Sequence, residues 1–213
     1  MAVTEKLTAL QVMQDAPVIP VIVLNDVDHA IPMARALVAG GLRMLEITLR
    51  TKVALDCMRR IAAEVPEAVV GAGTIRSVAD AKAALDAGAV FGVSPGYTST
   101  IGKACQDLGL PLLPGVATGS EIMMAQEDGY TELKFFPAMQ AGGPNLLKAW
   151  SGPFADIKFC PTGGVTLENA PTLLALPNVA VVGGTWLTPA KLMEQGDWAA
   201  ITEMARQAAA LTR

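Results

Sequence analysis

The chain of 213 residues is 52% hydrophobic, and its formal net charge is −4, without a cluster of Lys and Arg. This balance argues against nucleic-acid binding and against attachment to a membrane surface. The apolar stretch at residues 18–24 is too short to span a bilayer and lacks a signal-peptide pattern, so we expect a cytoplasmic protein that acts on a small molecule.

Short apolar runs alternate with amphipathic stretches along the chain. A helix is predicted over residues 4–14, and strand-like runs begin near Val18, Met44, Ala68, Val90, Leu112, Glu132, Ile157 and Ala180. Helical periodicity follows these runs, for example at residues 30–39, 53–64, 78–87, 101–108 and 120–128. Eight such units predict an α/β fold, a single-domain (β/α)8 TIM barrel over residues 1–213 with an N-terminal helix.

An open doubly wound sheet would also alternate strands and helices. That fold is expected to carry a Gly-rich phosphate loop after its first strand. Asn25 and Asp26 follow the first strand here, and the glycine pairs come late in the chain. The barrel is therefore the better interpretation.

Lys134 is the most informative residue, because it lies inside a predicted strand between bulky apolar neighbours. Desolvation disfavours the ammonium form of a lysine and so supplies a neutral amine that attacks a ketone. The alternative is a structural lysine that pairs with a carboxylate or reaches out to solvent. Its surroundings in the pocket decide between these interpretations.

The second strand supplies those surroundings. Alternation predicts that Glu46, Thr48 and Arg50 share one face, the barrel interior, and so enter the same pocket as Lys134. Three inward polar residues on one strand are costly unless a ligand uses them. A buried ion pair between Glu46 and Arg50 is the alternative.

Two glycine pairs follow the last two strands, where many barrels bind phosphate through backbone N–H groups. They are Gly163-Gly164 and Gly183-Gly184, the second followed by Thr185. Tight turns alone would also explain them. His29 is the only histidine, and the three cysteines are far apart, so we expect no metal site and no disulfide. Cys160 is expected to be a buried structural thiol.

The sequence resembles the KDPG/KHG aldolase family over nearly its whole length. The resemblance rests on LEITLR at residues 45–50, GAGT at 71–74, KFFPA at 134–138 and FCPTGG at 159–164. It implies that Lys134 forms a Schiff base and that Glu46 is the general acid/base. It also implies the substrate-binding residues, which are Arg50 and Thr74 for the carboxylate, Gly163, Gly164, Gly184 and Thr185 for the phosphate, and Pro95, Phe136 and Thr162.

The resemblance further implies the reaction and its setting. A class I aldolase of this family cleaves 2-keto-3-deoxy-6-phosphogluconate to pyruvate and glyceraldehyde 3-phosphate, and 4-hydroxy-2-oxoglutarate to pyruvate and glyoxylate. It needs no cofactor, forms a homotrimer and serves the Entner–Doudoroff pathway. Two alternatives stay open: an aldolase for another phosphorylated sugar acid, such as the phosphogalactonate, and a non-catalytic phosphate-binding barrel. Thr185 departs from the serine that family members often carry.

Overall fold

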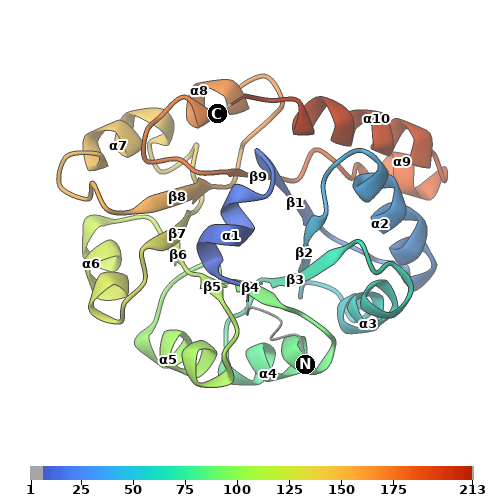
Figure 1. Cartoon of the computed structure of the whole chain (residues 1–213), viewed down its shortest axis with the longest axis horizontal. Coiled ribbons are helices and arrows are strands. Elements are labelled where there is room, and N and C mark those ends of the chain that lie inside the picture. The colour runs from blue at the N-terminus through green and yellow to red at the C-terminus, as the bar shows by residue number, and fades with distance from the viewer. Residues whose placement is uncertain (1–6, 213) are drawn as a thin grey trace, which may run out of the picture.

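The computed structural model describes residues 7–212, and its strands lie inside a ring of helices (Figure 1). Every strand pairing is parallel. One sheet has the order β5-β4-β3-β2-β1-β9, and the other has the order β6-β7-β8. The strands are β1 (Val18–Ile22), β2 (Met44–Thr48), β3 (Val69–Gly73), β4 (Phe91–Val93), β5 (Leu112–Leu113), β6 (Gly115–Val116), β7 (Glu132–Phe135), β8 (Lys158–Pro161) and β9 (Val182–Gly184).

The hydrogen-bonded ladders thus form two curled parallel sheets, where the sequence predicted one closed barrel of eight strands. The first break follows from Pro114, which separates β5 from β6 and has no N–H to donate to a ladder. At the second break, β8 and β9 are linked only through isolated bridges, one of which joins Thr162 to Gly183. The α/β class and the parallel arrangement are as predicted.

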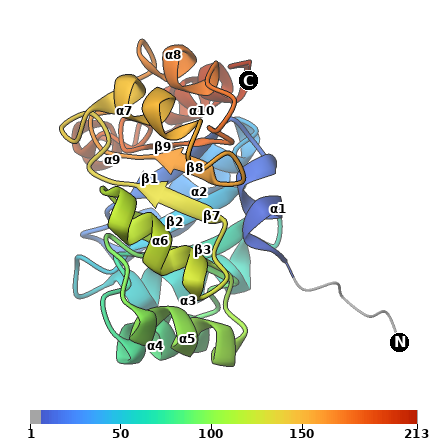
Figure 2. The same ribbon diagram turned by 90° about the vertical axis from the view of Figure 1, so that its left-hand side faces the viewer.

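Helices follow the strands and cover the outside of the sheets (Figures 1 and 2). The N-termini of α1, α4, α5, α6 and α10 are held by side-chain caps that the sequence supplies. Thr8 and Thr118 form capping boxes with Gln11 and Glu121, and Ser77 accepts a hydrogen bond from the backbone of Asp80. The helices are α1 (Ala9–Gln14), α2 (Ala30–Ala39), α3 (Ala54–Glu64), α4 (Val78–Asp86), α5 (Ser99–Leu108), α6 (Gly119–Glu127), α7 (Gly143–Trp150), α8 (Ala170–Leu174), α9 (Ala190–Glu194) and α10 (Trp198–Ala209).

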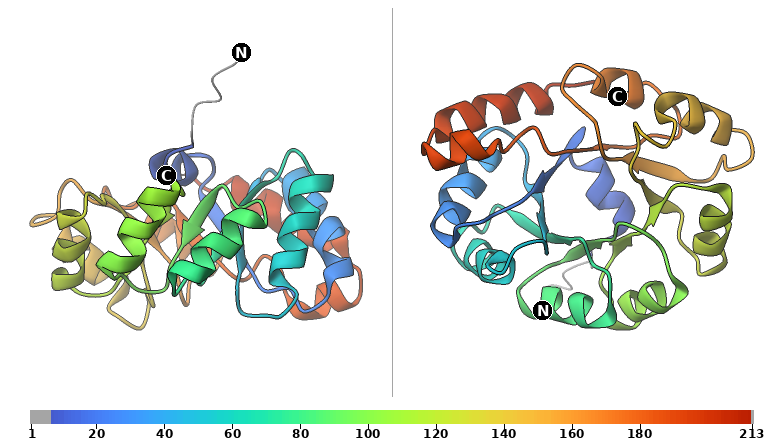
Figure 3. Two further views of the ribbon diagram at one scale, coloured as in Figure 1. Left: turned by 90° about the horizontal axis from the view of Figure 1, so that it is seen from below. Right: turned by 180° about the vertical axis from the view of Figure 1, so that it is seen from behind.

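The N-terminal helix lies at one end of the sheets, where the strands begin (Figure 3). Of the predicted helix over residues 4–14, residues 4–6 lie outside the described residues. The helix begins at Ala9, later than predicted, because Thr8 is its extended N-cap, and it ends at Gln14 as expected. Val12 and Met13 of α1 are fully buried in a core cluster with Phe91, Leu113 and other strand residues. The helix therefore covers the end of the sheets where the strands begin with apolar side chains, opposite the strand ends that carry the polar residues.

Candidate active site

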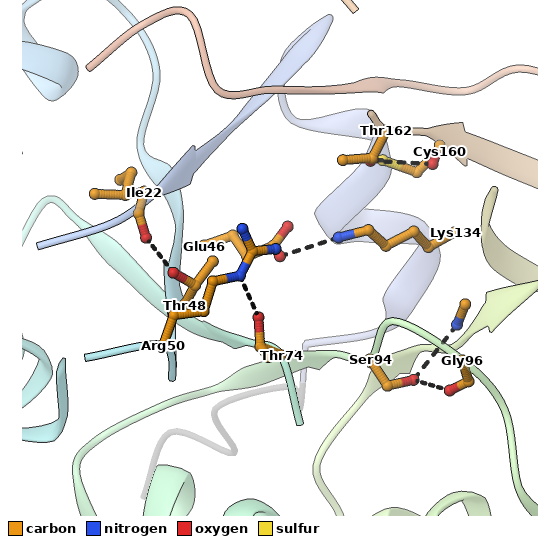
Figure 4. A network of polar contacts seen from close by, with 11 residues as sticks. Ile22, Glu46, Thr48, Arg50, Thr74, Ser94, Gly96, Lys134, Cys160 and Thr162 are labelled. Carbon is orange, nitrogen blue, oxygen red and sulfur yellow. Dashed lines mark hydrogen bonds and ion pairs between the residues drawn. The ribbon is translucent and has the colours of Figure 1, made fainter. Parts of the chain in front are cut away.

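A buried ion pair joins the two sheets at the centre of the site (Figure 4). Nζ of Lys134 on β7 lies 3.2 Å from Oε1 of Glu46 on β2. The two side chains are 4% and 3% exposed, although 88 positions separate them in sequence. The predicted proximity of Lys134 and Glu46 is therefore confirmed, and Glu46 pairs with Lys134 rather than with Arg50.

Lys134 is held by the strand that carries it. Its backbone N–H donates to the carbonyl of Pro114, 2.8 Å away, and its neighbours Leu133 and Phe135 are fully buried. Its Nζ lies 5.5 Å from the centre of the Phe136 ring. The ammonium group thus lies beside the carboxylate of Glu46, as Figure 4 shows, and near the ring of Phe136.

The three polar residues of the second strand do not share one role. Thr48 is fully buried, but its hydroxyl donates to the carbonyl of Ile22, 2.8 Å away, and so stabilises the pairing of β1 with β2. Arg50 lies beyond the end of β2 and is exposed, contrary to the prediction of an interior position. Alternation predicts a face only while the strand continues, and β2 ends at Thr48.

Arg50 is nevertheless directed towards the site by Thr74. Its Nε donates to the hydroxyl of Thr74, 3.0 Å away, across the ends of β2 and β3 (Figure 4). Thr74 has a φ of 65°, which is uncommon for a β-branched residue. Strained backbone of this kind persists where the surroundings enforce it and is frequent at binding sites. The arrangement presents a guanidinium group and a hydroxyl group together at the strand ends.

The turn after β4 packs against the strand pair β5 and β6. The Ser94 hydroxyl donates to the carbonyl of Gly96, 2.8 Å away, and accepts a hydrogen bond from the N–H of Gly115 at 3.4 Å. A Cβ on Gly115 would lie 2.4 Å from the carbonyl carbon of Pro95, so only glycine permits this contact. Ser94 and Gly115 thereby fix the position of Pro95.

The expected phosphate-binding glycines lie at the ends of β8 and β9. Gly163 and Gly164 have φ values of 99° and 72°, a conformation that favours glycine. The explanation by turn chemistry therefore applies to this pair. A Cβ on Gly163 would lie 3.3 Å from the Phe136 ring, which places the turn beside the residue that follows β7. Thr185 is exposed directly after β9.

The ring of Trp186 occupies the space beside Gly184, where a Cβ would lie 2.2 Å from it. Thr162 similarly fills the space beside Gly183, with its hydroxyl oxygen 2.2 Å from a built Cβ. These two glycines therefore serve close packing. The sequence identified the glycines but gave no sign of these partners, because the partners depend on how β8 meets β9.

Cys160 is buried, as predicted, and lies on β8 in register with Lys134. Burial raises the pKa of its thiol to about 12. A thiol in this state is a poor nucleophile, so Cys160 is a packing residue beside the ion pair.

Within residues 7–212, no three His, Cys, Asp or Glu side chains lie close enough together to hold a metal ion. A search of the same residues also finds no helix long and apolar enough to span a membrane.

Comparisons with known proteins place this geometry in a family. Residues 10–204 match the family model described as KDPG and KHG aldolase. The 2-dehydro-3-deoxy-phosphogluconate aldolase of Pseudoalteromonas atlantica is 49% identical over 96% of this chain and 95% of its own. The KHG/KDPG aldolase of Escherichia coli is 48% identical over 95% of both chains.

A solved structure shows the same fold. The KDPG aldolase of Legionella pneumophila, with pyruvate captured as a covalent carbinolamine, superposes with a TM-score of 0.94. It is 43% identical, and the match covers 96% of this chain and all of that one. The chain belongs to the KDPG and KHG aldolase family.

Proposed function

We propose that this protein is a class I aldolase that cleaves 2-keto-3-deoxy-6-phosphogluconate to pyruvate and glyceraldehyde 3-phosphate. We include the cleavage of 4-hydroxy-2-oxoglutarate to pyruvate and glyoxylate in the proposal, because the Escherichia coli relative is named for both substrates. The observation that carries the proposal is the buried pair of Lys134 and Glu46, which brings an amine and a carboxylate within 3.2 Å. The carbinolamine in the Legionella structure supports the covalent step.

The reaction begins at Lys134. Its ammonium group gives a proton to the adjacent carboxylate of Glu46, and the neutral amine attacks the C2 ketone of the substrate. The carbinolamine hydroxyl takes this proton back from Glu46 and leaves as water, so Glu46 is again a carboxylate. The protonated imine then accepts the electron pair of the C3–C4 bond.

Glu46 serves the proton transfers that follow. Its carboxylate takes the proton of the C4 hydroxyl as the C3–C4 bond breaks, so the aldehyde product is released and a pyruvate enamine remains. The carboxylic acid then returns this proton to C3. Water hydrolyses the imine, pyruvate leaves, and Lys134 and Glu46 regain their starting state. No cofactor takes part in this sequence.

The anionic ends of the substrate require two sites. We assign the carboxylate to Arg50 and Thr74, whose 3.0 Å contact aligns a guanidinium and a hydroxyl. The phosphate is assigned to Thr185 and to the backbone at the ends of β8 and β9, at Gly163, Gly164 and Gly184. Pro95, Phe136 and Thr162 line the substrate between these sites.

The finer architecture belongs to the same proposal. We propose one closed (β/α)8-barrel domain over residues 1–213, in which Pro114 interrupts one strand and the bridge between Thr162 and Gly183 joins β8 to β9. The family implies a homotrimer, which light scattering on the purified protein tests. A cytoplasmic location is part of the proposal, and fractionation of cells that produce the protein tests it.

Borohydride trapping with pyruvate tests the covalent mechanism. We expect one reduced pyruvate adduct per chain, on the peptide that contains Lys134, and none in Lys134→Arg. Lys158→Arg is the matched control, because Lys158 also lies on a strand but donates to the carbonyl of Pro177. A protein that gains no covalent mass, while still binding phosphate, would be a non-catalytic barrel. An adduct on another lysine would refute the assignment.

A further inference from the structure

The carboxylate of Glu46 occupies the space where a side chain of Gly73 would lie. Gly73 is the last residue of β3 and is in register with Thr48 of β2. A Cβ built on Gly73 would lie 2.3 Å from Oε1, 2.7 Å from Cγ and 2.9 Å from Cδ of Glu46. Carbon and oxygen atoms without a bond do not approach this closely, so any side chain here would displace Glu46.

The backbone does not require a glycine at this position. Gly73 lies in a regular strand and is not among the described glycines with a positive φ. A glycine inside a strand costs conformational entropy and offers no side chain to pack. The close approach of Glu46 is therefore the reason for a glycine here.

Glu46 has little freedom to move away from Gly73. Oε1, the atom nearest the built Cβ, is also the atom that pairs with Nζ of Lys134 at 3.2 Å. The side chain is 3% exposed, and β2 is tied to β1 by the hydrogen bond of Thr48 to Ile22. The carboxylate is thus confined between the β3 backbone and the lysine.

We propose that Gly73 is a positioning residue for Glu46: its bare Cα is the surface against which the carboxylate rests at proton-transfer distance from Lys134. This inference rests on the proposed function, since it assigns Glu46 the proton steps. A methyl group at residue 73 would push the carboxylate off this surface and change its distance and angle to the reacting carbon.

Other glycines nearby have different neighbours. Gly71 is also on β3, but a Cβ there would meet the ring of Phe91 at 2.1 Å, which is core packing. Gly92 on β4 would meet the methyl end of Ile75 at 2.7 Å, away from the ion pair. Gly92→Ala is therefore a matched control: it crowds a flexible apolar side chain and leaves Glu46 untouched.

Gly73→Ala tests the proposal through two partial reactions with pyruvate. Borohydride trapping reports imine formation on Lys134, and deuterium exchange of the pyruvate methyl group reports proton transfer by Glu46. We expect trapping to be retained and exchange to fall by about 10- to 100-fold, because misplacement by about 1 Å costs rate on this scale. Gly92→Ala should lower the melting temperature and leave the exchange rate of the folded protein unchanged.

The outcomes separate the two proposals. If the unaltered protein neither traps pyruvate nor exchanges its methyl protons, the proposed function fails. If it does both and Gly73→Ala exchanges within about twofold of it, at equal imine yield, the positioning role is refuted.

If Gly73→Ala does not fold, the substitution is tested together with Glu46→Ala, which removes the Oε1, Cγ and Cδ atoms that the added methyl group would meet. There the added methyl group should leave the melting temperature unchanged, and a loss as large as in the parent would overturn the proposal.

Discussion

Replacement of Lys134 by methionine should destabilise the fold, because it leaves the carboxylate of Glu46 buried without its partner. The two charged atoms are 3.2 Å apart and both side chains are less than one-twentieth exposed. With an effective dielectric constant of about 20, their attraction is about 5 kcal/mol. Loss of one partner from a buried pair typically costs about 3–5 kcal/mol, so we expect Lys134→Met to lower the free energy of unfolding by that amount.

Urea unfolding at pH 7 measures this loss, and thermal unfolding gives an independent value. In a chain of this size, 1 kcal/mol shifts the melting temperature by about 2–4 °C, so a fall of about 6–20 °C is expected. The double variant Lys134→Met/Glu46→Gln should recover much of the loss, because neither charge remains. Lys158→Met is the control for the substitution itself, because Lys158 donates to the carbonyl of Pro177 and has no carboxylate partner at that contact.

A loss below about 1 kcal/mol in Lys134→Met would refute the reasoning, because it would mean that Glu46 carries no buried charge in the native fold. A double variant as unstable as the single one would refute it in another way. The cost would then come from lost packing of the lysine stem rather than from an unpaired carboxylate.

The remaining predictions concern the reaction and the alkaline stability. Glu46→Gln should keep pyruvate trapping but lower kcat by about 10²- to 10⁴-fold, and a fall of less than about fivefold with a raised KM would make Glu46 a binding residue. Arg50→Ala should weaken the binding of pyruvate and of both aldol substrates by about 1.5–3 kcal/mol. Thr185→Glu should lower kcat/KM for the phosphorylated substrate only. Equal losses of kcat/KM on both substrates in Thr185→Glu would mean that Thr185 is not part of the phosphate site. EDTA should leave activity unchanged, and loss that a divalent ion restores would indicate metal-dependent chemistry. Burial raises the pKa of Cys160 from 9.0 to about 12. The thiol of the unfolded chain therefore ionises at lower pH than that of the folded protein, and stability should fall as the pH rises from 9.0 towards about 12. The urea midpoint of Cys160→Ala should fall less over the same pH range than that of the unaltered protein.

The strand and helix pattern could be predicted because local sequence determines it. All eight predicted strand starts lie within two residues of an observed one, and only the start of β6 was not predicted, since apolar runs and the glycines between them mark both ends of an element. The split at Pro114 was within reach of the same reasoning, because proline interrupts a ladder. The weak link between β8 and β9 was not, because it depends on the geometry with which the two strands meet.

The site could be predicted where it depends on strand position and could not where it depends on contacts across strands. Lys134 and Glu46 were identified from their place in apolar strands, and the structure brings them together. The position of Arg50 was wrong, because β2 ends two residues before it. The tasks of Thr48 and Gly73 could not be foreseen, because each depends on an atom from a neighbouring strand.

The helix α1 at the start of the strands has a kinetic consequence. Its fully buried Val12 and Met13 belong to an apolar cluster with strand residues such as Phe91 and Leu113, which fills this end of the sheets within residues 7–212. We therefore expect substrate to enter and products to leave at the opposite end, where the strand ends carry the polar residues. In the proposed mechanism pyruvate stays covalently bound to Lys134 until hydrolysis, so the aldehyde departs first and pyruvate last. Free aldehyde that returns before hydrolysis adds to the enamine and re-forms the substrate. Accumulated aldehyde should therefore slow net cleavage more than its binding to the free enzyme alone would.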